Sequence, residues 1–157
     1  LKDKPLYEPQ GIRGDGPAAA MRYWGVSQHQ YYARADVWPL APEGEILVII
    51  MIEDTRGIAN LGEMLAEVPG IGGVLIGEGD LSQELGVPRQ YEHPALLEAM
   101  AEVLKICREA GVPCGHPHVG SGNAERVVAD GYRILVSSAP RSFATLDKVR
   151  GLIGRAG

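Results

Sequence analysis

Residues 73–86 read GVLIGEGDLSQELG, in which an apolar run ends and a glycine and an aspartate, Gly79 and Asp80, come before the chain turns polar. Residues 46–54, ILVIIMIED, follow the same plan, because seven apolar residues end at Glu53. Apolar runs without polar alternation are typical of strands inside a parallel sheet that is covered on both faces. Both stretches therefore predict a buried strand that ends next to a carboxylate.

The rest of the chain also alternates between strand and helix patterns. We expect helices at 17–36, 57–68, 94–110, 123–129 and 142–153, and strands at 46–52, 73–76, 112–115 and 133–137. One helix followed by four β-α units predicts an α/β fold with a parallel sheet and right-handed crossovers. A doubly wound open sheet and part of an eight-stranded (β/α) barrel both fit this order. A complete barrel needs about 200 residues or more, so this chain could form only about half of one.

Size, charge and cysteine content narrow the function classes. A chain of 157 residues suits a single domain, 1–157, of which 1–16 is predicted to be an irregular entry loop. A net charge of −5 without a long Lys/Arg block argues against nucleic acid, and no apolar run approaches the ~20 residues of a membrane span. Two cysteines, Cys107 and Cys114, without CxxC spacing or a visible signal peptide predict a cytoplasmic protein with reduced thiols. Because the chain begins with Leu1 and not Met, we expect a piece of a longer protein.

The two acids that follow the strands are candidate metal ligands. In either architecture, chemistry gathers at the carboxyl ends of the parallel strands, so Glu53 and Asp80 are expected to meet there from neighbouring strands. Two converging carboxylates repel each other unless a cation lies between them, and a hard divalent cation prefers such ligands. Two protein ligands leave coordination positions open, as a Lewis-acid catalyst requires. The alternative is that Asp80 is only the N-cap of a following turn.

Four motifs together resemble the HpcH/HpaI family of metal-dependent pyruvate aldolases. They are GIRGDGPAAAMRY at 11–23, MIEDTRGIANL at 51–61, GVLIGEGDLSQELG at 73–86 followed by HPALLEAM, and AGVPCG at 110–115. They occur in order over essentially the whole chain, and the acid-bearing motifs are specific as a set. The resemblance implies a (β/α)8 TIM barrel of which this chain is roughly the later half, and a cytoplasmic homo-oligomer, in the family usually a hexamer.

The resemblance also implies an activity and a site. The family's class II aldolases cleave 4-hydroxy-2-oxo acids to pyruvate and an aldehyde through a metal-stabilised enolate. On the matching motifs, Glu53 and Asp80 would bind Mg, Mn or Co, and the main-chain N–H groups of Gly79 and Asp80 would hold the pyruvate carboxylate. The family's catalytic His and Arg come from the first strands of the barrel, which would lie upstream of Leu1. The activity would then belong to the whole barrel, with this chain as its metal-bearing part.

This chain departs from the family pattern at two positions near the acids. Glu78 stands where the family usually has a proline, and it adds a negative charge beside the predicted metal. The usual spacing back from Asp80 ends on Asp54, although Glu53 has the family residue type and follows the apolar pair in register. We favour Glu53 and keep Asp54 as the alternative. A truncated binding or assembly unit, or another metal-enolate lyase or hydrolase, would also fit this sequence.

Other residues remain candidates with open roles. His116 and His118, on either side of Pro117, lie just past the third expected strand and could form a zinc pair, face the substrate, or simply pack in a loop. The resemblance favours a place for all three at the aldehyde end of a substrate pocket. Arg13, in a glycine-rich loop that matches the family, could order the rim of the same pocket or be a solvent-exposed arginine of a turn. The aromatic residues Tyr23, Trp24, Tyr31 and Tyr32 are expected to pack in a core or a subunit interface.

Overall fold

The computed structural model describes Gly14 and residues 16–137 and 143–154. In these ranges the strands are β1 (Val48–Ile52), β2 (Ile71–Ile76), β3 (Cys114–His116) and β4 (Ile134–Leu135). The helices are α1 (Ala18–Trp24), α2 (Gln28–Arg34), α3 (Thr55–Glu67), α4 (Glu78–Glu84), α5 (Pro94–Glu109), α6 (Ala124–Asp130) and α7 (Ala144–Leu152). The predicted alternation of strands and helices is confirmed, with one additional helix, α4, directly after β2.

The four strands form one parallel sheet in the order β1-β2-β3-β4. Ile50 pairs with Val74, Val74 with Cys114, and Gly115 with Ile134, so each strand lies beside the one that precedes it in the chain. A doubly wound sheet reverses its strand order at a switch point, and these four strands contain no reversal. The sheet is that of a partial (β/α) barrel.

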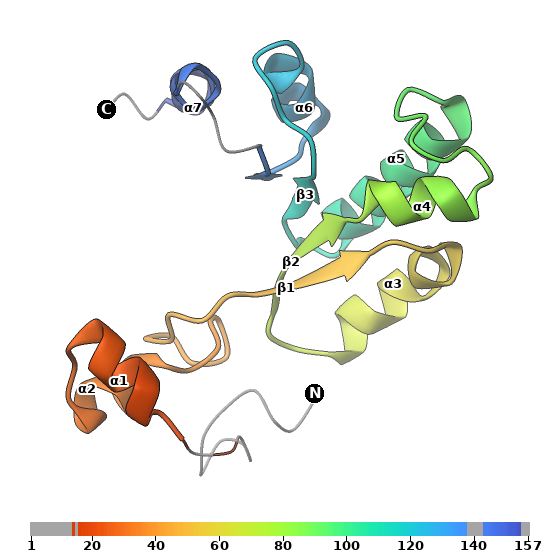
Figure 1. Ribbon diagram of the computed structural model, residues 1–157. Helices are drawn as coiled ribbons and strands as arrows, with labels where there is room; N and C mark the ends of the chain where they lie inside the picture. The colour runs from red at the N-terminus through yellow and green to blue at the C-terminus, as the bar shows by residue number, and fades with distance from the viewer. Residues whose placement is uncertain (1–13, 15, 138–142, 155–157) are drawn as a thin grey trace.

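The helices cover one face of the sheet. Strand side chains such as Ile52, Val74 and Ile76 are buried against residues of the helices, which include Leu61, Leu96, Met100, Val103 and Cys107. Burial of apolar surface at roughly 25 cal/mol per Å² makes this layer the main source of stability. The core therefore lies between the strands and the helices, outside the curve of the sheet (Figure 1).

The other face of the sheet is open in the described part of the chain. Leu47, Ile49, Met51 and Val136 are 40–53% exposed on this face. The sequence predicted that the first strand is covered on both faces, but only one face is covered here. The two-residue period of a strand points Ile50 and Ile52 toward the helices and the residues between them toward the uncovered side, and because both sets are apolar the sequence does not distinguish the two faces.

The single helix expected at 17–36 is two helices. Gly25 has a φ of 66°, the left-handed conformation that commonly ends helices, and it terminates α1. Ser27 then starts α2 with a capping box, because its hydroxyl accepts from the amide of Gln30 and the Gln30 side chain accepts from the amide of Ser27. Neither helix contains a buried residue, and both lie away from the strands in Figure 1. Trp24 stacks on Tyr31 at 6.4 Å, yet Tyr23 is 85% exposed, so these aromatic rings do not form a closed core in the described chain.

Both cysteines lie in the core as free thiols. The Cys107 thiol on α5, together with burial, raises the pKa of Cys114 on β3 well above its usual value. No helix in the described ranges is both long enough and apolar enough to cross a membrane.

Truncating one side chain in the packed layer between sheet and helices, and one on the open face of the sheet, tests this arrangement. Leu61→Ala removes a fully buried side chain of α3 and should lower the free energy of unfolding by about 2–5 kcal/mol. Met51→Ala, on the open face, should cost less than about 1 kcal/mol, within the range of most exposed substitutions. Urea denaturation followed by circular dichroism measures both values. In this chain by itself, an equal loss for Met51→Ala would contradict the open face, because it would mean that this side chain is covered without the rest of a barrel.

Candidate metal and substrate site

The site forms where the carboxyl ends of β1 and β2 meet. The amide of Gly77 donates to the carbonyl oxygen of Ile52 at 2.8 Å, which extends the β1–β2 pairing by one residue beyond Ile76. Glu53 follows Ile52 directly, and α4 begins directly after Gly77. The two acid-bearing segments are therefore neighbours in space, as the sequence predicted.

Glu53 lies against Gly77 on the open face of the sheet. A Cβ built at Gly77 would be 2.6 Å from Cβ of Glu53, 3.1 Å from its Oε2 and 3.2 Å from Sδ of Met51. No real Cβ tolerates the first of these distances, so a residue with a side chain at position 77 would displace Glu53. The missing side chain of Gly77 is what lets the Glu53 carboxylate lie beside the start of α4.

Asp80 is the third residue of α4, and its side chain is exposed. The N-cap of this helix is Gly77, which has no side chain to cap it, so the alternative that Asp80 is an N-cap is wrong. The first hydrogen bond within the helix runs from the Leu81 amide to the Gly77 carbonyl oxygen. The amides of residues 78–80 precede it and are therefore not used by the helix's own hydrogen bonds. A Cβ at Gly79 would meet nothing within 4 Å, so there is open space beside this residue.

Asp54 has a different role from its neighbour Glu53. It is the N-cap of α3, and its Oδ1 accepts from the amide of Gly57. The next residue, Thr55, donates from its amide to the Glu84 carboxylate at 3.1–3.2 Å, which ties the start of α3 to the end of α4. Because the Asp54 carboxylate is held by the helix, Glu53 is the better candidate for a metal ligand.

Glu78 and His118 form a pair that the sequence did not predict. The Glu78 side chain is 4% exposed, and its Oε1 is hydrogen-bonded to Nδ1 of His118, whose side chain is 60% exposed. The ring of Tyr91 packs beside the imidazole with a centroid distance of 5.4 Å. In the sequence this pair was indicated by Glu78 alone, which stands where the family usually has a proline. The spacing along the chain does not connect Glu78 to the loop after the third strand.

His116 is held differently from His118. It is buried on β3 with its ring edge-on to Tyr132 at 5.1 Å, and its Nδ1 accepts from the amide of His118 at 3.2 Å. Burial lowers the pKa of His116 below its usual value, although the nearby Glu78 opposes this shift in part. No cluster of three or more His, Cys, Asp or Glu side chains that could hold a metal was found among the described residues. Pro117 is half-buried between the two histidines, and Arg13 lies outside the described residues.

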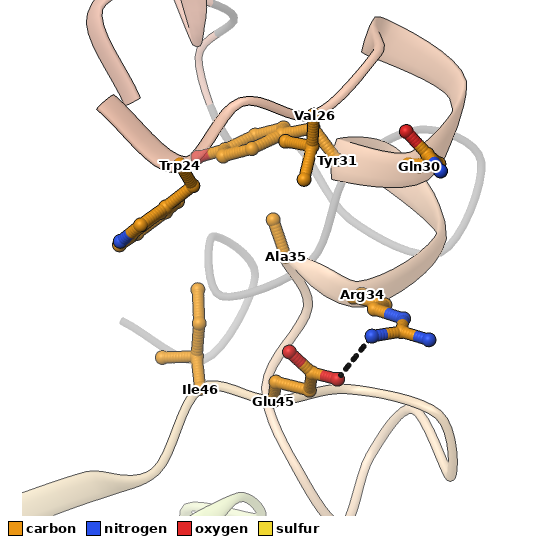
Figure 2. A pocket seen from close by; sticks show the side chains of 8 residues that line it. All are labelled: Trp24, Val26, Gln30, Tyr31, Arg34, Ala35, Glu45 and Ile46. Atoms are coloured by element: carbon orange, nitrogen blue, oxygen red, sulfur yellow. Dashed lines mark ion pairs between the residues drawn. The ribbon is translucent and has the colours of Figure 1, made fainter. Parts of the chain in front are cut away.

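A separate cavity of about 340 Å³ lies between α1, α2 and the chain that leads to β1 (Figure 2). Apolar and aromatic side chains line most of it, and its charged residues, Arg34 and Glu45, pair with each other at 3.2 Å. Glu53 and Asp80 are not among its lining residues. We therefore treat it as separate from the candidate site.

Comparison with known proteins gives the family. The family model described as HpcH/HpaI aldolase/citrate lyase matches residues 4–138. The chain belongs to this family. The resemblance drawn from the motifs is confirmed.

Relatives of this HpcH/HpaI family member include named aldolases. It is 39% identical over 105 residues to a 4-hydroxy-2-oxovalerate aldolase of Rhodococcus jostii, covering 67% of this chain and 37% of the relative. It is 32% identical over 125 residues to a 2-keto-3-deoxy-L-rhamnonate aldolase of Klebsiella pneumoniae, covering 80% of this chain and 44% of that protein.

Solved structures of the HpcH/HpaI family share its fold. The crystal structure of a family protein from Burkholderia cenocepacia matches with a TM-score of 0.70 and 26% identity, over 98% of this chain and 56% of the other. The chain thus spans about half, or less, of the length of the proteins that it matches.

Two variants of Asp54 test whether Glu53 or Asp54 is the metal ligand, because they separate helix capping from metal binding. Asp54→Ala should lower the free energy of unfolding by about 0.5–2 kcal/mol, because α3 loses its cap. Asp54→Ser should keep most of that stability, since a serine hydroxyl also caps helices. Binding of Mn²⁺, followed by electron paramagnetic resonance of the free ion, should persist in both variants. Loss of Mn²⁺ binding in the stable Asp54→Ser variant would assign the ligand to Asp54 instead of Glu53.

Proposed function

We propose that this chain forms the metal-binding part of an aldolase that cleaves 4-hydroxy-2-oxo acids to pyruvate and an aldehyde. The observation that carries the proposal is the exposed Glu53 carboxylate held against Gly77, at the start of the helix that bears Asp80. Membership of the HpcH/HpaI family and the aldolase names of its relatives support the reaction class.

The donor set fits a hard divalent cation such as Mg, Mn or Co. Both candidate ligands are carboxylates with exposed side chains, and such cations prefer oxygen ligands and retain positions for water or substrate. When bound, the cation would supply Lewis acidity that stabilises the negative charge developing on the substrate as the carbon–carbon bond breaks. Gly77 contributes by leaving room for the Glu53 side chain.

Other residues of this chain would bind and orient the substrate. The amides of Gly79 and Asp80, in the first turn of α4, would donate to the carboxylate of pyruvate, and the open space beside Gly79 would admit it. Pro117, His116 and His118 follow the neighbouring strand and would flank the aldehyde end. Of these, the buried His116 would act by supporting the loop, since its ring packs on Tyr132. Arg13 would contribute at the rim.

The complete reaction requires residues beyond this chain. The resemblance implies that a general acid–base histidine and an arginine would come from earlier strands of the barrel, and general acid–base catalysis contributes roughly 10²–10⁴-fold. The length relative to its relatives and the open apolar face of the sheet both support an assignment of the activity to a larger barrel. By the same resemblance we propose a homo-oligomer, a hexamer in the usual family arrangement, that works in the cytoplasm.

Pyruvate release tests the proposed reaction. The intact protein that contains this chain should release pyruvate from 4-hydroxy-2-oxovalerate, as measured by NADH oxidation with added lactate dehydrogenase. EDTA should abolish the release and Mn²⁺ or Mg²⁺ should restore it. Asp80→Ala should lower kcat/KM by at least about 10²-fold, since one of two protein ligands is lost. Turnover of other 2-oxo acids without pyruvate release would favour another lyase or hydrolase, and folded protein without any turnover would favour a binding or assembly unit.

The two glycines beside Glu78 offer a matched test of the metal site. Gly77→Ala should weaken Mn²⁺ binding by about 10-fold or more, because the new Cβ would overlap the Glu53 side chain. Gly79→Ala places a Cβ in open space and should leave Mn²⁺ binding within about threefold of wild type, while alanine improves the helix. Calorimetric titration with Mn²⁺ gives both affinities. Equal affinities in the two variants would contradict the placement of the Glu53 ligand.

A further inference from the structure

The first turn of α4 carries the candidate ligand Asp80 but has little support of its own. The helix has seven residues, and isolated helices of that length are unstable in water. Its N-cap, Gly77, provides no side-chain bond to the helix amides. Asp80 itself is exposed. The position of its carboxylate therefore depends on how the residues on either side are held.

On the far side of Asp80, the turn is anchored through Ser82. Ser82 is fully buried, and its hydroxyl donates to the carbonyl oxygen of Gly79 at 2.7 Å while accepting from the amide of Arg89 at 2.9 Å. Leu81 is also fully buried in the core. These contacts fix the carboxyl side of the turn to the body of the protein.

On the near side, the anchor is the pair formed by Glu78 and His118. The loop that holds His118 is itself well fastened, because Nδ2 of Asn123 donates to the His118 carbonyl at 2.9 Å and Oδ1 of Asn123 accepts from the Gly120 amide at 2.8 Å. With the ring of Tyr91 beside it, the imidazole is held from several directions. Glu78, the first residue of α4, is thereby tied to the loop after β3.

A buried acid at this place is costly and needs an explanation. Burying a carboxyl group is unfavourable unless it is paired, so a simple helix start would not select Glu78. Proline is the favoured residue at the first position of a helix, because its fixed φ preorganises the turn. Here the first position of the helix is fixed instead by the hydrogen bond between the Glu78 side chain and His118, in the loop after β3.

We propose that Glu78 and His118 are positioning residues, which hold the first turn of α4 so that the Asp80 carboxylate stays in reach of a cation shared with Glu53. This inference rests on the proposed metal site. The pair acts through the backbone of residues 78–80 and does not itself contact the cation. Hydrogen-bond partners behind metal ligands typically contribute 10–100-fold in metal affinity, and the same range is expected here.

Mn²⁺ affinity of the intact protein tests the proposal. His118→Ala and Glu78→Ala should each weaken Mn²⁺ binding by about 10-fold or more, as for other residues that orient ligands. The double variant should be no weaker than the weaker single variant, because the two residues act as one unit. Glu78→Pro should restore affinity to within about threefold of wild type by fixing the same turn. Glu92→Ala is the control, since it removes an exposed carboxylate next to Tyr91 in the sequence, whose ion pair in the described structure is with Arg126 at 3.9 Å.

The outcomes separate positioning from other roles. If Glu78 acted only through its charge, His118→Ala would leave Mn²⁺ affinity unchanged or raise it, because the carboxylate would lose its partner. If the pair were only a structural brace, the thermal unfolding midpoint would fall while Mn²⁺ affinity stayed constant. Either result would overturn the proposal. Failure of the wild-type protein to bind Mn²⁺ would overturn the proposed metal site itself, a result distinct from both.

Discussion

The amide of Gly77 donates to the carbonyl oxygen of Ile52 at the last paired position of β1 and β2, and the arrangement of the candidate site follows from this bond. It fixes the residue after β1 beside the residue that starts α4. A one-residue slip in this pairing would turn the side chain of Glu53 to the helical face of the sheet. The absence of a side chain at Gly77 completes the arrangement, because it leaves the space that Glu53 uses.

Four acids, Glu53, Asp54, Glu78 and Asp80, follow the carboxyl ends of β1 and β2, and they differ in the bonds that their side chains make. The Asp54 carboxylate caps α3 and the Glu78 carboxylate is hydrogen-bonded to His118, whereas within the described ranges neither Glu53 nor Asp80 has such a side-chain bond, and both are exposed. Like charges at short range destabilise one another, and bonding two of the four lessens that repulsion. Glu53 and Asp80 are the pair that the family resemblance associates with a metal.

The sequence predicted the strands and their parallel order well, because long apolar runs bounded by glycines and acids leave few alternatives. It missed α4, since a segment with Gly79 inside it and Gly86 after it has poor helix propensity, and burial of Leu81 and Ser82 overrides that propensity. It also joined α1 and α2, because the apolar rhythm continues across Gly25. The bond between Glu78 and His118 joins residues 40 positions apart, and no local pattern encodes such a contact. The sequence also did not show which face of β1 is open, because the strand is apolar on both faces.

Both tryptophans of the chain lie outside the layer of buried residues between sheet and helices. Trp24 ends α1 and is 63% exposed, and Trp38, in the loop before β1, is 49% exposed. Indole emission depends on contact with water, and these two rings already have much of that contact in the folded state. Intrinsic fluorescence would therefore report on the segment around α1 and α2 and would respond only weakly when the packed layer behind β1 and β2 melts.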